Sequence, residues 1–409
     1  MFSPSPLQIL CFQKFLMLSS SISSIAGFLL LSPEAAFPSM IAAIELAAEA
    51  FSDACLRCLL AAGTSFALLM ICAPSALRWL SGRCRERIVS DSQRLNELHA
   101  AKQNTPTMGG LLLVFAVLTS TLIWCDLRIA SIRISIFVLL AMTALGAVDD
   151  WFKLTQRSSG MTARRKLLFQ AAIGVLTGLA LQRTLNQFPS DQAAPLAPVS
   201  FLQMFNTSEH TWWVIAWSAF LIVAVSNAVN LTDGLDGLAS GCSLTTLLAL
   251  IVIAFITVAG DSMRNQLAVL DPLQQPVPQR QREMVEAAVQ LSALGGSLLA
   301  FLWFNSFPAR VFMGDTGSLL IGALLAFNAL MIRCELLLVV AGGVFVVETL
   351  SVMLQVAWFK RTRRRLLLCS PLHNHFVFRG DHEQKIVVRF WIASTVLSIL
   401  AVTAHAIVR

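Results

Sequence analysis

Long apolar stretches recur along this chain of 409 residues, and they restrict its fold more than any other feature. A helix that crosses the ~30 Å hydrocarbon layer of a membrane needs about 20 apolar residues and satisfies its own backbone hydrogen bonds. Ten stretches are predicted to do so: 59–80, 108–124, 129–148, 167–181, 212–229, 238–259, 287–304, 319–332, 336–359 and 386–408. The fourth and eighth are short, so their helices are expected to extend into neighbouring residues.

The composition indicates the same class. Hydrophobic residues make up 56% of the chain, charged residues only 13%, and the mean hydropathy is +0.72. A soluble domain contains about 25% charged residues. About half of that fraction is too low to cover the water-exposed surface of a soluble protein of this length. The sequence therefore predicts an all-α polytopic membrane protein with about ten transmembrane helices.

The first 58 residues form an N-terminal extension to the ten-span region, which covers residues 59–409. Residues 9–31 are apolar apart from Lys14 and a serine-rich centre. This pattern fits an extra span, a signal-like segment or sequence upstream of the true start. Residues 42–54 carry three acidic side chains among alanines, which suits an interfacial helix. These alternatives stay open at the level of sequence.

Lysine and arginine are distributed unequally between the two sides of the predicted helices. The loops after the first, third, fifth, seventh and ninth spans share one side and hold eighteen of the thirty basic residues. The positive-inside rule places these loops in the cytoplasm. This bias and anionic lipid account for the net charge of +7. No nucleic-acid partner is expected, because the chain lacks a basic patch with interleaved aromatic residues.

Polar motifs occur in all five of these loops and therefore on one predicted side. They are Lys-Gln-Asn-Thr-Pro-Thr-Met-Gly-Gly at 102–110, Asp-Asp-Trp-Phe-Lys at 149–153, Asn-Ala-Val-Asn-Leu-Thr-Asp-Gly-Leu-Asp-Gly at 227–237, Asn-Ser-Phe-Pro-Ala-Arg-Val-Phe-Met-Gly-Asp-Thr-Gly-Ser at 305–318 and Pro-Leu-His-Asn-His-Phe at 371–376. Five such clusters on one face are improbable by chance. We therefore predict a single composite active site at the cytoplasmic face.

The motifs contain five aspartates beside apolar runs: Asp149, Asp150, Asp233, Asp236 and Asp315. Uncompensated carboxylates are costly there, and they repel one another unless a cation joins them. Mg²⁺ is the predicted cofactor, because it typically binds one or two carboxylates together with substrate phosphates. Lys102, Lys153 and two histidines add positive or proton-transferring groups, and the combination favours phosphoryl transfer.

Spacing within the motifs gives further expectations. Asp149 and Asp150 adjoin at a helix end and are predicted to point about 100° apart, in separate roles. Asp233 and Asp236 are three residues apart and are predicted to share a helix face. The Gly-Asp-Thr-Gly segment at 314–317 is predicted to start a helix whose free N–H groups favour phosphate.

Simpler interpretations exist for single motifs. The aspartate pair would also suit a solvated helix end, and residues 230–237 resemble part of a calcium loop that lacks its terminal Glu. His373 and His375 would point to opposite faces of an extended segment. A secondary transporter would also carry aspartates in its spans, but near mid-bilayer and often in repeated halves. The shared side of the motifs favours an enzyme.

In this order, the motifs resemble those of the polyprenyl-phosphate N-acetylhexosamine-1-phosphate transferase superfamily. The resemblance rests on Asn-Thr-Pro-Thr-Met-Gly-Gly, Asp-Asp-x-x-Lys, the 227–237 string, Phe-Met-Gly-Asp-Thr-Gly-Ser and Pro-Leu-His-x-His-Phe, and it covers residues 59–409. The last string resembles the phospho-N-acetylmuramoyl-pentapeptide transferase branch. Branches that use UDP-N-acetylglucosamine are the alternative.

The resemblance implies transfer of phospho-MurNAc-pentapeptide from UDP-MurNAc-pentapeptide to undecaprenyl phosphate, which gives lipid I and UMP with Mg²⁺. It implies a multi-pass enzyme of the bacterial inner membrane, acting in the first membrane step of peptidoglycan synthesis and forming a homodimer. Direct attack by the lipid phosphate is the preferred mechanism. An initial attack by an aspartate, forming a phospho-enzyme, is the alternative.

The resemblance also assigns roles to individual residues. Asp315 is expected to be the principal Mg²⁺ ligand, and Asp149 and Asp150 further ligands and a catalytic pair, one of which deprotonates the lipid phosphate. Lys153 is expected to neutralise phosphate, and His373 matches an essential histidine. The expected substrate-binding residues are Lys102, Thr107, Asn230, Asp233, Asp236, Asn305, Phe312 and His375, with Phe312 a candidate to stack on uracil.

Two positions depart from the family pattern. The family usually has three consecutive histidines, but the middle one is Asn374 here, and an amide cannot take up a proton. Trp151 stands where Tyr is common. An acid–base role at position 374 is therefore not expected.

Overall fold

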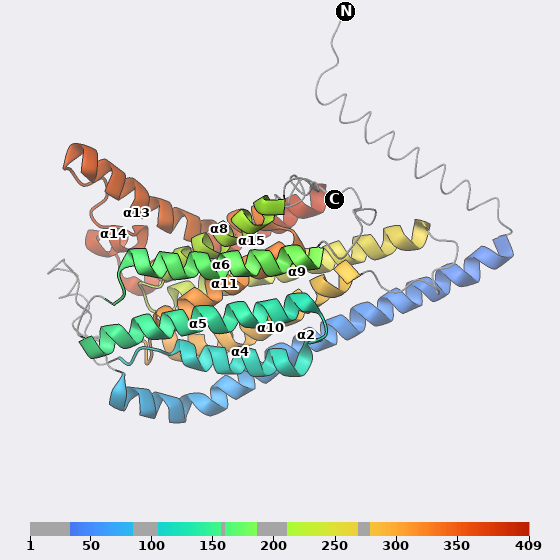
Figure 1. The fold of residues 1–409 in the computed structure, drawn as a ribbon, viewed down its shortest axis with the longest axis horizontal. Coiled ribbons are helices and arrows are strands. Elements are labelled where there is room, and N and C mark those ends of the chain that lie inside the picture. The colour runs from blue at the N-terminus through green and yellow to red at the C-terminus, as the bar shows by residue number, and fades with distance from the viewer. Residues whose placement is uncertain (1–32, 85–104, 157–159, 186–210, 269–278, 409) are drawn as a thin grey trace, which may run out of the picture. The chain divides into compact units, whose positions relative to one another are not determined.

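The computed structural model describes residues 33–84, 105–156, 160–185, 211–268 and 279–408, and these ranges are built from helices (Figure 1). The helices are α2 (Pro33–Arg83), α4 (Gly110–Trp124), α5 (Ala130–Gln156), α6 (Ala163–Leu185), α8 (Thr211–Thr232), α9 (Leu238–Ala268), α10 (Gln279–Asn305), α11 (Gly314–Ile332), α12 (Glu335–Ala341), α13 (Gly343–Thr362), α14 (Leu372–Arg379) and α15 (Glu383–Val408). No strand occurs within the described ranges.

Contacts divide the chain into two compact units. One consists of Arg57–Ile256 and Arg282–Arg409, and it includes every described site residue predicted from the sequence. The described residues of the other unit lie within Met1–Leu56 and Thr257–Gln281. The predicted site residue Lys102 and the apolar segment 9–31 both lie outside the described residues.

Nine of the described helices are long and apolar enough to cross a membrane, and α4, with 15 residues, is a shorter apolar helix. Each of the ten predicted stretches coincides with helical structure. Helices α6 and α11 extend beyond the short stretches 167–181 and 319–332, as expected. The prediction of an all-helical, multi-pass membrane protein is confirmed for the described part of the chain.

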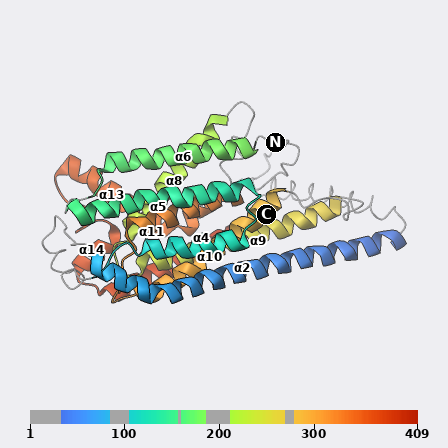
Figure 2. The same ribbon diagram turned by 60° about the horizontal axis from the view of Figure 1, so that its bottom comes forward.

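Helix α11 is the central helix of the larger unit. Every residue from Asp315 to Ile332 is buried, and α11 packs against α4, α5 and α8 (Figure 2). The outer helices α13 and α15 instead expose apolar side chains such as Leu350, Met353 and Ile399. Apolar side chains outside and a closed helical backbone are what contact with lipid requires. The central helix begins at the Gly-Asp-Thr-Gly motif and thereby positions the site.

The ninth predicted span, 336–359, is not one helix. It is divided into α12 and α13 at Gly342, which has φ −87° and ψ 19°. The break falls at a pair of glycines, which cost a helix conformational entropy and leave its backbone unprotected. A Cβ at Gly343 would lie 2.9 Å from Cδ1 of Leu397, so the second glycine also lets α13 approach α15 closely.

Residues 42–54 are continuous with the first span. Helix α2 runs from Pro33 to Arg83, so the segment expected to form an interfacial helix belongs to the same helix as residues 59–80. Alanine and glutamate are among the strongest helix formers, and the segment contains no residue that would end the helix before the apolar stretch begins.

Candidate active site

Asp149 and Asp150 lie inside helix α5, whereas the sequence predicts them at the start of a loop. Helix α5 continues to Gln156, two turns beyond the predicted span. Lys153 therefore follows the pair on the same helix, and its Nζ lies 3.1 Å from Oδ2 of Asp149 and 3.7 Å from Oδ1 of Asp150. The same Nζ lies 3.2 Å from Oδ2 of Asp315 on α11. One ammonium group thus contacts three of the predicted carboxylates.

Asp150 caps helix α11. Its Oδ1 accepts a hydrogen bond from the backbone N–H of Asp315 (3.0 Å). Its Oδ2 accepts from the backbone N–H and the hydroxyl of Thr316 (3.0 and 2.6 Å). The prediction that these two N–H groups are free to bind phosphate is wrong, because Asp150 occupies them. A carboxylate is favourable at a helix N-terminus, and here it holds Asp315 against α5.

Two glycines allow α5 and α11 to meet this closely. A Cβ at Gly146 would collide with the backbone carbonyl of Asp315. Gly314 has φ +71°, a conformation that only glycine adopts without strain, and a Cβ there would lie 2.6 Å from Oδ2 of Asp150. Gly146 and Gly314 therefore serve the packing of the acidic residues.

A second lysine joins the site from the start of α6. The ammonium of Lys166 contacts Oδ2 of Asp315 and lies 3.6 Å from Oδ2 of Asp149. Oδ1 of Asp149 accepts from the backbone N–H of Met161 (2.6 Å). With its amide oriented to suit these neighbours, Asn230 donates to Oδ1 of Asp315 (3.0 Å) and accepts from Nζ of Lys166 (3.0 Å). Helices α5, α6, α8 and α11 all contribute side chains.

We call this group the aspartate–lysine cluster; it consists of Asp149, Asp150, Asp315, Lys153, Lys166 and Asn230. Its three carboxylates are 3%, 1% and 7% exposed, and two ammonium groups leave one negative charge unbalanced. Within the described ranges, no three His, Cys, Asp or Glu side chains are arranged as a metal shell. The ammonium groups lie among the carboxylate oxygens instead. Oxygen donors with residual negative charge nevertheless match the chemistry that Mg²⁺ prefers.

Asp233 and Asp236 lie in the turn between α8 and α9. The prediction that they share a helix face is wrong, because α8 ends at Thr232 and α9 begins at Leu238. Gly237 has φ +76°, a left-handed conformation that interrupts a right-handed helix. The turn, residues 233–237, therefore presents the two carboxylates from a non-helical backbone.

Contacts tie this turn to other parts of the site. Oδ2 of Asp236 accepts from the backbone N–H of Ala309 (2.9 Å), and the backbone N–H of Asp236 donates to Glu383 (2.9 Å). Oδ1 of Asn305 accepts from the backbone N–H of Gly237 (3.1 Å). Asp236 and Asn305, both predicted to bind substrate, thus also hold the 233–237 turn against the segment between α10 and α11.

Burial raises the pKa of Asp233 to about 7, aided by the negative charges of Asp315, Asp150 and Asp236. An ordinary Asp titrates near pH 4. The folded protein therefore binds a proton at Asp233 more tightly than the unfolded chain does. Stability contributed by this proton is present at low pH and decreases as the pH rises from about 4 to about 7.

Replacement of Asp233 by Asn is expected to reduce this loss of stability. In detergent without divalent cations, the Tm of the native chain should fall between pH 5 and pH 8. Asp233→Asn should lessen that fall by several degrees, equivalent to about 1–3 kcal/mol. Asp381→Asn is the matched control, because hydrogen bonds from Arg379 lower the pKa of Asp381 instead. Identical pH profiles for Asp233→Asn and the native chain would contradict the prediction.

The two histidines lie in the short helix α14, so the condition of an extended segment, under which they would point to opposite faces, does not apply. His373 is 1% exposed; its backbone N–H donates to Oε1 of Glu348 (3.1 Å), and its Nδ1 lies 3.1 Å from Oε2 of the same carboxylate. His375 has a different partner, since its Nδ1 accepts from the backbone N–H of Leu368 (3.2 Å). The two rings thus do not form a metal-binding pair.

The remaining predicted residues lie where two motif segments pair. The backbone N–H of Phe312 donates to the carbonyl of Pro106 (2.8 Å), and the carbonyl of Phe312 accepts from Gly109 (2.9 Å). Thr107 is buried between these contacts, and a Cβ at Gly314 would lie 3.1 Å from its hydroxyl. These backbone contacts fix Phe312, whose side chain is half-buried, two residues before the Gly314 that adjoins Asp150.

Several known proteins are similar to this chain over most of its length, and they have the same name. A profile described as "Glycosyl transferase family 4" matches residues 132–333. A phospho-N-acetylmuramoyl-pentapeptide-transferase of Maridesulfovibrio salexigens is 39% identical over 345 residues, which are 83% of this chain and 90% of that protein. Proteins of the same name from Neisseria gonorrhoeae (38% over 349 residues, covering 85% and 92%) and Nitratidesulfovibrio vulgaris (42% over 348 residues, covering 84% and 91%) are also similar. The chain belongs to the phospho-N-acetylmuramoyl-pentapeptide transferase family.

Membership of the phospho-N-acetylmuramoyl-pentapeptide transferase family confirms the resemblance of the five motifs and makes the chain a phosphoglycosyl transferase of the membrane. Three residues of the site were nevertheless missed by sequence reasoning: Lys166, Glu348 and Glu383. Glu348 gives a detectable signal, because it is an ionisable residue inside an apolar stretch. Nothing in the sequence separates Lys166 from the neighbouring Arg164 and Arg165.

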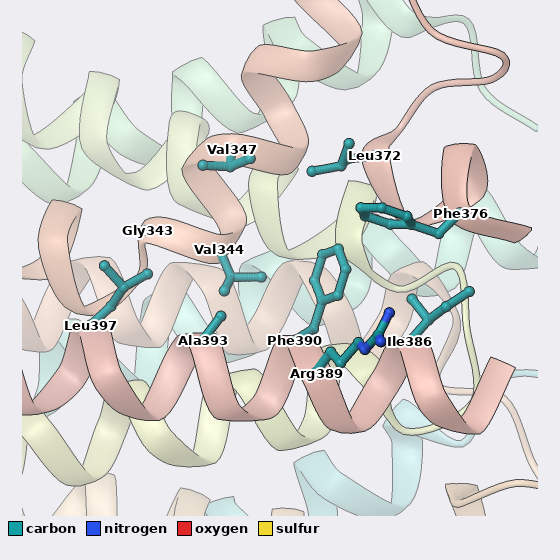
Figure 3. Close-up of a pocket in the computed structure, with 10 residues that line it drawn as sticks. All are labelled: Gly343, Val344, Val347, Leu372, Phe376, Ile386, Arg389, Phe390, Ala393 and Leu397. Carbon is teal, nitrogen blue, oxygen red and sulfur yellow. The ribbon is translucent and has the colours of Figure 1, made fainter. Parts of the chain in front are cut away.

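In this phospho-N-acetylmuramoyl-pentapeptide transferase family member, a groove of about 280 Å³ lies between α13, α14 and α15 (Figure 3). Its walls are apolar except for one charged residue, Arg389 of α15. Leu372 and Phe376 of α14, which line one side, neighbour the buried His373 in sequence. The groove therefore lies next to the helix that carries the predicted histidine, among helices with exposed apolar side chains.

Proposed function

We propose that the chain transfers phospho-MurNAc-pentapeptide from UDP-MurNAc-pentapeptide to undecaprenyl phosphate, giving lipid I and UMP. The supporting observation is the aspartate–lysine cluster, in which two lysines meet three buried carboxylates. Two phosphate-bearing anions repel each other strongly, and fixed cations in a partly buried site lower that repulsion. The names of the relatives support the transferred phospho-N-acetylmuramoyl-pentapeptide group, and with it a role in peptidoglycan synthesis. The lipid carrier is proposed on the family resemblance.

We place the site at the cytoplasmic face of the bacterial inner membrane. The loops that carry the motifs also carry the excess of lysine and arginine, which the positive-inside rule assigns to the cytoplasm. A water-soluble nucleotide sugar would reach the site from that side. A homodimer is also proposed, on the family resemblance alone, and the mass of the purified complex tests it.

The donor set fits Mg²⁺. Asp315 and Asp149 would hold the ion, since their Oδ2 atoms contact lysine ammonium groups that can transfer to substrate phosphates, and the two carboxylates also contact each other. Asp150 is a less suitable ligand, because both its oxygens already accept hydrogen bonds from α11. When bound, a divalent ion supplies charge neutralisation for phosphates.

Direct transfer is the proposed mechanism. An oxygen of the lipid phosphate attacks the phosphorus bonded to the sugar, the bond from this phosphorus to the UMP oxygen breaks, and UMP leaves. Asp149 is the proposed base for the lipid phosphate, whereas Asp150 is held by α11. Lys153 and Lys166 would bind the phosphates of the two reactants. Isotope exchange between UMP and the UDP-sugar without lipid phosphate would support the covalent alternative instead.

Release of UMP by the purified full-length chain tests the proposed function. With undecaprenyl phosphate and Mg²⁺, UMP should appear with UDP-MurNAc-pentapeptide and not with UDP-N-acetylglucosamine. If UMP appeared with UDP-N-acetylglucosamine but not with UDP-MurNAc-pentapeptide, the chain would belong to the alternative branch. Release with neither sugar would contradict the enzymatic proposal.

The apolar groove is the proposed position for part of the hydrocarbon chain of the lipid substrate. A Trp at Ala393, one of the lining residues, would fill much of the groove. Ala393→Trp is expected to raise the KM for undecaprenyl phosphate roughly tenfold, equivalent to about 1.4 kcal/mol, and to leave the KM for the nucleotide sugar unchanged. Ile392→Trp, on the same helix but outside the groove and already 59% exposed, is the matched control. Equal lipid KM values for both variants would exclude the groove.

A further inference from the structure

We propose that Glu348 is a positioning residue that fixes the orientation and tautomer of the His373 imidazole. Both oxygens of its carboxylate are directed at this one residue: Oε1 accepts from the backbone N–H and Oε2 lies 3.1 Å from Nδ1. A carboxylate accepts only, so Nδ1 must carry a proton. In the neutral ring, Nε2 is then the unprotonated nitrogen.

Burial makes this arrangement specific. Glu348 is 0% exposed and His373 is 1% exposed. A buried carboxylate inside a membrane-spanning helix is costly and stays only where it is paired. Glu348 of α13 and His373 of the short helix α14 are 25 residues apart in the sequence. Their contact therefore also holds α14 against α13.

The free nitrogen is directed at the 233–237 turn. A Cβ at Gly234 would collide with Nε2 of His373, so the ring edge lies directly against this backbone. Gly234 lies between Asp233 and Asp236, two of the predicted substrate-binding residues in this turn. Of the two ring nitrogens, only Nε2 is therefore directed toward the candidate active site.

These observations indicate that Glu348 acts on the reaction indirectly, by controlling the protonation of His373. A partner on one ring nitrogen decides which proton the other nitrogen carries, and thus whether it can accept a proton or donate one. The inference rests on the proposed function, because it gives a substrate-facing task to Nε2. The inference goes beyond the proposed function because it assigns Glu348, a residue in the second turn of α13, to the active site.

Glu348→Gln tests the inference with little change in shape. The amide oxygen can still accept from the backbone N–H of His373, but its NH₂ group would donate to Nδ1 and move the ring proton to Nε2. We expect kcat for UMP release to fall by about 10²-fold or more, as for tautomer errors in other His–carboxylate pairs. The KM for UDP-MurNAc-pentapeptide should stay within about threefold, because phosphate and nucleoside contacts are unchanged.

Two further measurements separate positioning from simple stabilisation. In a His373→Gln background, Glu348→Gln should cost no additional kcat, since residues that act as one unit are not additive. ¹⁵N spectra of histidine-labelled protein at high pH, assigned by the signal that His373→Gln removes, should show the proton on Nδ1 in the native chain and on Nε2 in Glu348→Gln. The spectra do not depend on activity, so they distinguish failure of this inference from failure of the proposed function.

Gln355→Leu is the matched control, because Gln355 is a buried polar residue of the same helix that binds the backbone of Leu366 and Leu367 instead. It should lower Tm without moving the His373 signals. Three results would overturn the inference: a native His373 protonated on Nε2, an unchanged kcat in Glu348→Gln, or an equal loss in the His373→Gln background.

Discussion

Asp315→Asn is expected to lower kcat for UMP release by about 10³-fold or more, which corresponds to about 4 kcal/mol of transition-state stabilisation. The carboxylate of Asp315 contacts both lysines of the cluster, and it is also the proposed principal ligand of Mg²⁺. Asparagine has nearly the same shape but no charge, so it would bind neither the metal ion nor the ammonium groups in the same way. UMP release at saturating Mg²⁺ measures the loss.

The fold should survive this substitution. The N–H of residue 315 would still donate to Asp150, so the cap of α11 is retained. Asp126→Asn is the matched control: Asp126 pairs with the exposed Arg128, and such solvent-screened surface pairs contribute little to stability. Full Mg²⁺-dependent activity of Asp315→Asn in a folded protein would remove Asp315 from the proposed mechanism.

Lys166→Met is expected to lower kcat/KM by about 10²-fold and to lower Tm without divalent cations. Removal of one ammonium leaves a single lysine facing three carboxylates, two of which contact Lys166 directly. An unpaired charge in a partly buried cluster destabilises a protein by about 3–5 kcal/mol. The substitution also removes a cation that would otherwise bind substrate phosphate.

The stability of this variant should respond to Mg²⁺. The extra negative charge favours binding of a divalent cation, so added Mg²⁺ should raise the Tm of Lys166→Met more than that of the native chain. Arg165→Met is the matched control, because it removes the same charge from the neighbouring residue, which is exposed. This variant should behave like the native chain in the activity assay and in the Tm measurement. If Mg²⁺ raised neither Tm, the proposed metal site in this cluster would be contradicted.

Sequence alone determined the fold class and the grouping of the motifs. Membrane-spanning stretches can be read one at a time, because the length and apolarity of a helix in lipid are local properties. The motifs around Asp149, Asp233 and Asp315 could be assigned to one side from the order of spans and the bias of basic residues. The extent of α5 and the break at Gly342 could not, because they depend on neighbouring helices as well as on local propensity.

Tertiary structure decided which partner each charged residue has. Asp150 caps α11 through a residue 165 positions later, Lys166 contacts a carboxylate 149 residues away, and Glu348 of α13 pairs with His373 of α14. The first two pairings follow from the close approach of α5 to α11, where Gly146 and Gly314 leave room, and from the packing of α6 against α5. No periodicity in the sequence encodes either contact. The sequence gives the chemical type of each residue. Which charged group neutralises a buried carboxylate depends on how the helices pack in three dimensions.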